Sequence, residues 1–298
     1  MARKHTHSIQ SSRSSRTDAG FSIIELLTAI TIASLTFATA STLMSAGRYF
    51  MQNQMQRIET VQALRSTIDS LTRDLRLSGA CLPTTGDFSP IDATNSGAGT
   101  NDIITTRSGL VRPNLTCIFS PLTTDVAANT TSLPVQSTSG FAAGMGGYIF
   151  NPVTNTGQDF NIVSISGNTI VSDTLTSQAY SSLADGTASA STVYAVDRRK
   201  YAVDSTQNPP VLTLSIDGAT AQPFAQGIET MNIQYRLLRN CPPCDSPELP
   251  ASTDWPLLNE VIFNVTARSQ KTDINGNYFR RNAVFIAKPR NLIPIPPS

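Results

Sequence analysis

Residues 20–47 read GFSIIELLTAITIASLTFATASTLMSAG, an apolar run that carries a single charge, Glu25. The 22 residues from Leu26 to Gly47 are all uncharged. As a helix with a rise of 1.5 Å per residue they would reach about 33 Å. That length matches the hydrocarbon core of a bilayer, which is roughly 30 Å thick. We therefore predict a transmembrane helix over residues 21–47.

Residues 1–20 are polar, with a net charge of +3. One interpretation is a cleavable secretory signal, with Ala38-Thr39-Ala40 as the cleavage site. The other places the cut between Gly20 and Phe21, so that the leader is removed and the apolar helix is kept. We favour the second interpretation, because Glu25 has no use in a cleavable apolar segment and the helical pattern continues beyond Ala40.

The segment GFSIIELL, from Gly20 to Leu27, resembles the prepilin motif of type IV pilins and type II secretion pseudopilins. The shared features are a glycine before the cut, an aromatic new first residue and a glutamate at the fifth position of the mature chain. The resemblance implies that a prepilin peptidase and methyltransferase cleaves after Gly20 and methylates the amino group of Phe21. It also implies that Glu25 acts in assembly.

A bare carboxylate inside a membrane costs at least about 2.5 kcal/mol, so Glu25 should have a function and a partner. The new α-ammonium group of Phe21 in a neighbouring subunit is the candidate partner. Neutralising both charges would favour transfer of each subunit from lipid into a filament. The alternative is a carboxylate near a helix end that reaches the membrane surface.

Residues 48–79 continue the helix in amphipathic form. The predicted apolar stripe, with steps of three or four residues, is Met51, Met55, Ile58, Val61, Leu64, Ile68, Leu71 and Leu75. The spacing predicts one helix from Phe21 to Ser78, ended by Gly79 as the residue after the cap. Its second half should pack against a globular head, although a coiled coil would fit the same spacing.

Residues 80–298 are expected to form a β-rich head. We predict strands at Ile103–Arg107, Thr116–Ser120, Gly147–Asn151, Phe160–Ser166, Thr169–Asp173, Val193–Asp197, Lys200–Val203, Val211–Ile216, Ile228–Leu237, Asn259–Arg268 and Tyr278–Ala287. Gly167-Asn168 and Asn275-Gly276 are predicted turns, and residues 84–100 and 174–191 are predicted loops. The fold class is therefore α+β, with one long N-terminal helix packed on an antiparallel sheet that carries β-rich insertions.

The order of these pieces resembles the PilW-like minor pilins and, more distantly, the GspJ-like pseudopilins. The carrying stretches are residues 140–150 with 160–166, then 193–203, 224–235, 261–269 and 278–291. The resemblance implies a non-enzymatic subunit, held first in the bacterial inner membrane with its head in the periplasm and later in a type IV pilus. Its implied partners are other minor pilins, the major pilin, the inner-membrane assembly platform and inner-membrane lipid.

Four cysteines, Cys81, Cys117, Cys241 and Cys244, suggest disulfides in an exported chain, with three possible connectivities. We favour Cys81–Cys117 and Cys241–Cys244. Redox and metal alternatives stay open for the Cys241-Pro-Pro-Cys244 motif. Thiol oxidoreductases place such a pair at a helix N-terminus, whereas here prolines surround it. A zinc site of four cysteines would normally use two such pairs.

The composition excludes several classes of function. Both histidines, His5 and His7, lie in the predicted leader, so the mature chain would lack histidine-dependent catalytic and zinc sites. The net charge of +1 gives no general attraction for nucleic acid, and none is predicted as a partner. We expect no cofactor, no metal and no catalytic residue. The alternatives are a type II secretion pseudopilin, a secreted adhesin-like β protein and, on the Cys-Pro-Pro-Cys motif alone, a periplasmic thiol enzyme.

Overall fold

A computed structural model describes residues 22–83, 88–94, 101–182, 190–237, 258–273 and 275–291, together with the backbone of 245–246. Four residues of the predicted sites, Gly20, Phe21, Cys241 and Cys244, lie outside this described part. The chain forms two compact units, Met1–Asn53 and Gln54–Ser298. Each unit is described by itself below.

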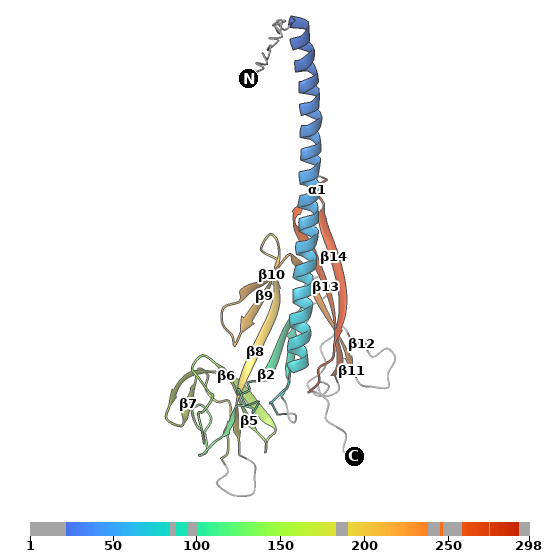
Figure 1. Cartoon of the computed structure of the whole chain (residues 1–298). Coiled ribbons are helices and arrows are strands. Elements are labelled where there is room, and N and C mark those ends of the chain that lie inside the picture. The colour runs from blue at the N-terminus through green and yellow to red at the C-terminus, as the bar shows by residue number, and fades with distance from the viewer. Residues whose placement is uncertain are drawn as a thin grey trace, which may run out of the picture. The chain divides into compact units, whose positions relative to one another are not determined.

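The helix α1 runs over Ile23–Leu77 and is the one α-helix in the described part of the chain (Figure 1). Its end agrees with the prediction. The Ser78 N–H still bonds to the Asp74 carbonyl at 2.9 Å, and Gly79 then takes a positive φ of 79°. A Cβ at Gly79 would lie 3.2 Å from both the Asn291 carbonyl and Pro90, so glycine suits this position for its backbone and its space.

The buried face of α1 differs from the predicted stripe. Leu64, Leu71 and Leu75 are buried as expected, but the earlier members Met51, Met55 and Ile58 are exposed. The residues that α1 buries are Thr60, Leu64, Thr67, Leu71, Asp74 and Leu75. From Thr60 to Asp74 the steps are of three and four residues, and Leu75 lies four residues after Leu71, so the set still describes one helix face, which begins later than predicted and includes polar residues.

Among the described residues the larger sheet has ten strands, joined in the order β1-β2-β8-β5-β6-β7-β4, with β3 and β9 also paired to β8 and β10 paired to β9. Its strands are β1 (Ile91–Thr94), β2 (Ile103–Gly109), β3 (Phe119–Pro121), β4 (Ser132–Pro134), β5 (Gly146–Asn151), β6 (Thr156–Ser166), β7 (Thr169–Ser172), β8 (Thr192–Asp204), β9 (Val211–Ile216) and β10 (Gln222–Gln226). The pairings are antiparallel throughout.

The second sheet has four strands in the order β12-β11-β13-β14. They are β11 (Ile228–Leu237), β12 (Asp245–Ser246), β13 (Leu258–Thr272) and β14 (Tyr278–Ala287), again antiparallel. The predicted turn at Asn275-Gly276 joins β13 to β14, and Gly276 has a φ of 79°. The predicted turn at Gly167-Asn168 likewise joins β6 to β7. The coarse class, one long helix and an antiparallel β head, is therefore confirmed.

Two main hydrophobic cores lie in the head. The first contains Leu64, Leu71 and Leu75 of α1 together with side chains of strands in both sheets. The second contains side chains of β4 to β8 and of the described segments between β2 and β4. β8 contributes to both, with Val193 in the second core and Tyr201 in the first.

Some predicted strand boundaries were wrong. Val193–Asp197 and Lys200–Val203 are one continuous strand, β8, because Arg198 and Arg199 extend through it with ion-pair partners on either side. The predicted loop over 84–100 contains strand β1, whose alternation of buried and exposed residues spans only four positions. β4 and β10 were also missed because each is short and contains a proline.

Candidate functional site

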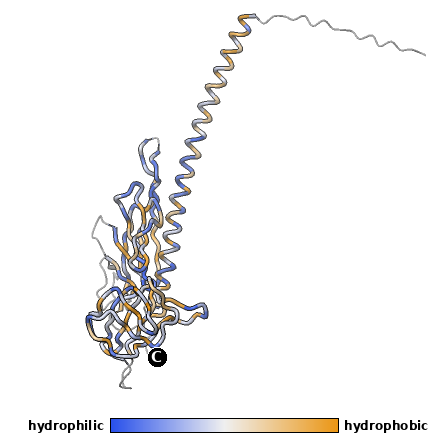
Figure 2. Tube along the Cα trace, turned by 90° about the vertical axis from the view of Figure 1, so that its left-hand side faces the viewer, coloured by the Kyte–Doolittle hydropathy of each residue, from blue (hydrophilic) through white to orange (hydrophobic). Residues whose placement is uncertain are grey.

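The first unit holds the segment predicted to cross a membrane. α1 is the one helix in the described part of the chain that is long and apolar enough for this, with an 18-residue window of mean hydropathy 1.8 near the N-terminus. Orange and white dominate its first turns in Figure 2. The large apolar residues exposed there include Ile23, Ile24, Leu26, Leu27, Ile30, Ile32, Leu35, Phe37, Leu43 and Met44. Since they cover all sides of the helix, water alone is an unfavourable environment for this segment.

The many hydroxyl groups of this segment do not contradict a membrane location. Seven of the nine serine and threonine hydroxyls between Ser22 and Ser45 bond to a backbone carbonyl three or four residues earlier, at 2.8–2.9 Å. The residues are Thr28, Thr31, Ser34, Thr36, Thr39, Thr42 and Ser45. Because the helix itself satisfies these donors, they need no partner from water or lipid.

Glu25 lies in the first turn of α1, as the predicted assembly residue. A carboxylate at this end of a helix interacts favourably with the helix dipole. The backbone N–H of Glu25 bonds to the Ser22 carbonyl at 3.0 Å, and the Glu25 side chain is exposed. No ion pair to Glu25 occurs within the described ranges, and the predicted partner group belongs to Phe21, which is outside them.

In the second unit, a buried carboxylate ties the last turns of α1 to β8. The Asp74 side chain is 4% exposed. It accepts hydrogen bonds from the Arg199 guanidinium at 3.2 and 3.3 Å and from the Tyr201 hydroxyl at 2.6 Å. The Ser70 hydroxyl lies 2.8 Å from the same Tyr201 oxygen. Arg199 is also paired with Asp197 at 2.9 Å. Helix and strand are therefore joined by charge as well as by packing.

Burial raises the pKa of the Tyr201 phenol above its usual range, and the hydrogen bond to Asp74 raises it further. The phenol therefore stays protonated and continues to donate its hydrogen bond well into alkaline pH. A groove of about 280 Å³ opens beside this cluster and is lined by Arg73, Asp74, Thr106 and Arg199, among others. The charged groups of this cluster are paired with one another, which fits a structural role in holding α1 to β8.

The sequence prediction missed Asp74. The signal was present in the spacing, since Thr60, Leu64, Thr67, Leu71 and Asp74 follow one another by four, three, four and three residues. A charged residue on the buried face of a helix normally requires a partner. The partner lies 125 residues away in sequence. No local pattern identifies Arg199 as the residue that pairs with it.

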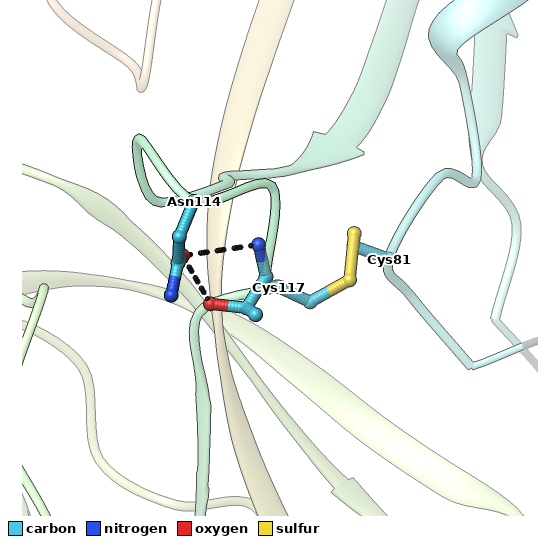
Figure 3. The surroundings of a disulfide bond; sticks show 4 residues. Cys81, Asn114 and Cys117 are labelled. Atoms are coloured by element: carbon cyan, nitrogen blue, oxygen red, sulfur yellow. Dashed lines mark hydrogen bonds between the residues drawn. A yellow bond between two sulfur atoms is a disulfide. The ribbon is translucent and has the colours of Figure 1, made fainter.

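The Cys81–Cys117 disulfide is present, as favoured from the sequence (Figure 3). Its Cα atoms are 5.5 Å apart and it spans 36 residues. It fixes the segment after α1 to the loop before β3. At Gly109 the backbone passes so close that an added Cβ would lie 2.7 Å from the Cys81 Cβ, and the Gly109 N–H bonds to the Ala80 carbonyl at 2.7 Å. The other favoured pair, Cys241 and Cys244, lies outside the described residues.

The loop that ends at Cys117 is held in one conformation. Figure 3 shows the Asn114 side chain folded back within this loop, where its oxygen accepts the Thr116 N–H at 3.3 Å and the Thr116 hydroxyl at 2.7 Å. The Arg112 N–H bonds to the Thr116 carbonyl at 2.8 Å. These bonds and the disulfide together explain how the exposed Leu115 keeps a positive φ of 64°.

Two other groups of charged residues have structural partners. Arg198 and Arg199, adjacent arginines in β8, pair with Asp217, Asp74 and Asp197. Asp273 stabilises the turn between β13 and β14, where its carboxylate accepts the N–H groups of Asn275 and Asn277. Within the described part of the chain, no group of three or more potential metal ligands comes together.

Comparisons with known proteins give little guidance. No protein-family model matches the chain, and no curated protein matches it. One solved structure is similar to part of it, the Gp54 tailspike of Acinetobacter baumannii bacteriophage AP22 in complex with A. baumannii capsular saccharide. The identity is 17% and the TM-score 0.22, over 30% of this chain and 15% of the tailspike chain. A likeness of this size carries no argument about fold or function.

Proposed function

We propose that this protein is a non-enzymatic minor pilin of the PilW-like kind, which is processed at Gly20–Phe21 and helps to initiate or assemble a type IV pilus. The observation that carries the proposal is the first half of α1. It is apolar on all sides and exposed, seven of its hydroxyls bond to the helix's own carbonyls, and it has one carboxylate, Glu25, in its first turn. An N-terminal helix with these properties fits subunits that pass from a bilayer into a helical filament.

The prepilin-like motif from Gly20 to Leu27 supports the same proposal. Glu25 would pair with the methylated amino group of Phe21 on a neighbouring subunit, so that two charges costly in lipid are neutralised together in the filament. The head, facing the periplasm or the exterior, would then support motility, adhesion or DNA uptake. Its partners would be sister minor pilins, the major pilin and the assembly platform.

The test is a set of substitutions at Glu25 in cells that produce the full chain. Glu25→Ala and Glu25→Gln should still be processed but should enter filaments poorly, because the charge pair is lost. Thr28→Ala, one turn further along α1, is the matched control and should assemble normally. Normal filament entry of both Glu25 variants would contradict the proposed pairing.

A type II secretion pseudopilin is the alternative function within the same class. Deletion of the gene separates the two, because loss of pili with normal secretion supports the minor pilin. Loss of protein secretion with normal pili would assign the chain to a secretion system. A mature chain that begins after Ala40 would favour a secreted adhesin-like β protein.

A further inference from the structure

The edge strand β14 of the four-stranded sheet carries an apolar surface that the fold does not use. Within the described part of the chain, β14 pairs with β13 alone and ends the sheet (Figure 1). Its inner residues Ala283, Phe285 and Ala287 pack in the first core. Its outer residues Val284 and Ile286 are 63% and 48% exposed.

An exposed face of an antiparallel sheet is normally polar, which makes this pair of residues unusual. The register sets Ile286 beside Ile262 of β13 and Val284 beside Asn264, so the apolar outer surface continues onto the neighbouring strand. Proteins usually protect such edges by charges, prolines or bulges. From Ala283 to Ala287 there is neither charge nor proline. The register shift between β13 and β14 falls at Arg268/Thr272, away from this segment.

Positive charges lie on both sides of the apolar segment. On one side are Arg280 and Arg281, and on the other are Lys288 and Arg290. Arg280 is paired with Glu229 at 2.7 Å and Lys288 with Glu260 at 2.8 Å. Arg281 and Arg290 are exposed, and no ion pair to either occurs in the described ranges. A strand added to this edge would therefore meet cations at both of its ends.

This charge pattern disfavours a second copy of the same chain. An antiparallel pair of two β14 edges centred on Phe285 would bring the end of one copy that carries Arg280 and Arg281 to the end of the other that carries Lys288 and Arg290. Like charges that face each other across paired strands are destabilising. We propose that the edge formed by residues 283–287 is a docking site for an extended strand of a different protein, with alternating apolar residues at its centre and acidic residues at its ends. Such a strand would gain main-chain hydrogen bonds, apolar contacts with Val284 and Ile286, and ion pairs at each end.

The test uses the full chain in lipid nanodiscs and a synthetic fluorescent peptide of nine residues. The peptide has valines at alternating positions in its centre and two glutamates at each end. We expect saturable binding by fluorescence anisotropy. A peptide with lysines in place of the glutamates should bind at least about tenfold more weakly at low salt. Equal binding of the two peptides would overturn the proposed charge recognition.

Substitutions in and beside β14 test whether the peptide binds at this edge. Val284→Ser combined with Ile286→Ser should weaken binding of the glutamate peptide about tenfold, since both contacts are outside the core. Val163→Ser is the matched control, because Val163 is an exposed valine (56%) on another strand, β6, and its variant should bind as the original chain does. Arg281→Glu combined with Arg290→Glu should reverse the preference between the two peptides. Unchanged binding by the serine variant, or no reversal by the glutamate variant, would overturn the proposal.

Two further measurements address other occupants of the edge. Amide hydrogen exchange of residues 283–287 in the free chain should be faster than exchange in the centre of β13, because alternate amides face an open edge. Equally slow exchange would mean that another part of the chain already covers this edge, contrary to the proposal. Sedimentation of the nanodisc-embedded chain should show a monomer. A dimer that disappears in the serine variant would mean that a second copy of the chain occupies the edge, contrary to the proposal.

Discussion

Between Ile23 and Asn53, α1 exposes large apolar side chains on all sides, whereas between Gln54 and Leu77 it buries one narrow face in the core of the head. Leu35 and Leu71 illustrate the difference, with exposed fractions of 68% and 0%. The two halves belong to one uninterrupted helix. Leu71 therefore contributes to the core of the head, whereas Leu35 belongs to no core in the described part of the chain.

The polar residues of the two halves of α1 also differ in where they find their hydrogen-bond partners. In the first half, hydroxyls bond to the helix's own carbonyls and Glu25 is exposed. In the second half, Asp74 is buried and takes its partners from β8. The polar groups of the first half are thus compatible with apolar surroundings, whereas Asp74 in the second half is bonded to β8.

The largest effect is expected at Asp74. Asp74→Ala would leave the partly buried Arg199 without its helix partner and Tyr201 without its acceptor, and removing one member of a buried ion pair costs about 3–5 kcal/mol. Chemical denaturation of the head should show this loss. Asp69→Ala, an exposed aspartate on the same helix, is the control and should change stability by less than about 0.5 kcal/mol. Equal effects of the two variants would contradict the role given to Asp74.

Loss of the Cys81–Cys117 bridge should have the next largest effect. Closing a loop with this separation of 36 residues stabilises a fold by about 4 kcal/mol in the chain-entropy account. Replacing both cysteines by serine should lower the unfolding free energy of the head by an amount of this order, while membrane association through the first half of α1 stays unchanged. Flotation with liposomes measures the second property.

A matched pair of leucine variants tests the comparison most simply. Leu71→Ala should cost the head about 3 kcal/mol, because a fully buried leucine is removed from a packed core. Leu35→Ala, in the exposed half, should leave the unfolding of the head unchanged. If the two variants destabilised the head equally, the division of α1 into two environments would be incorrect.

The smallest effect concerns pH. The pKa of Tyr201 is raised in the folded state by burial first and by Asp74 second. Its contribution to stability is therefore complete below the ordinary tyrosine pKa of about 10 and declines as the pH rises above that value. Tyr201→Phe should cost about 2 kcal/mol at neutral pH through the lost bond to a charged group, and the alkaline decline should become shallower. An unchanged alkaline decline would show that Tyr201 is not its source.

The sequence was sufficient for the features that depend on local patterns. The apolar run, the end of α1 at Gly79 and the turns at Gly167 and Gly276 all follow from short stretches, and the cysteine count suggested disulfides, of which the favoured Cys81–Cys117 bridge is present. The features it missed depend on distant residues. Met55 and Ile58 fit an apolar stripe, but the head does not cover them. Asp74 is compatible with burial only because β8 supplies Arg199 and Tyr201.

The strand boundaries show the same limit. Arg198 and Arg199 interrupt the apolar alternation of β8, yet the strand continues because Asp217 and Asp74 neutralise them from other elements. Val284 and Ile286 are typical strand residues, but as apolar residues they are unusual on the exposed side of a sheet. Alternation alone predicts that a strand exists, and it does not predict which of its faces is covered.

The first half of α1 is the part of the chain on which the proposed function depends, and the mass of the mature protein tests it directly. Intact mass spectrometry of the chain purified from membranes of its native host should give a polypeptide that begins at Phe21, carries one methyl group on its amino terminus and retains residues 21–47. A mature chain that begins at Ser41, or that otherwise lacks this apolar helix, would contradict the account.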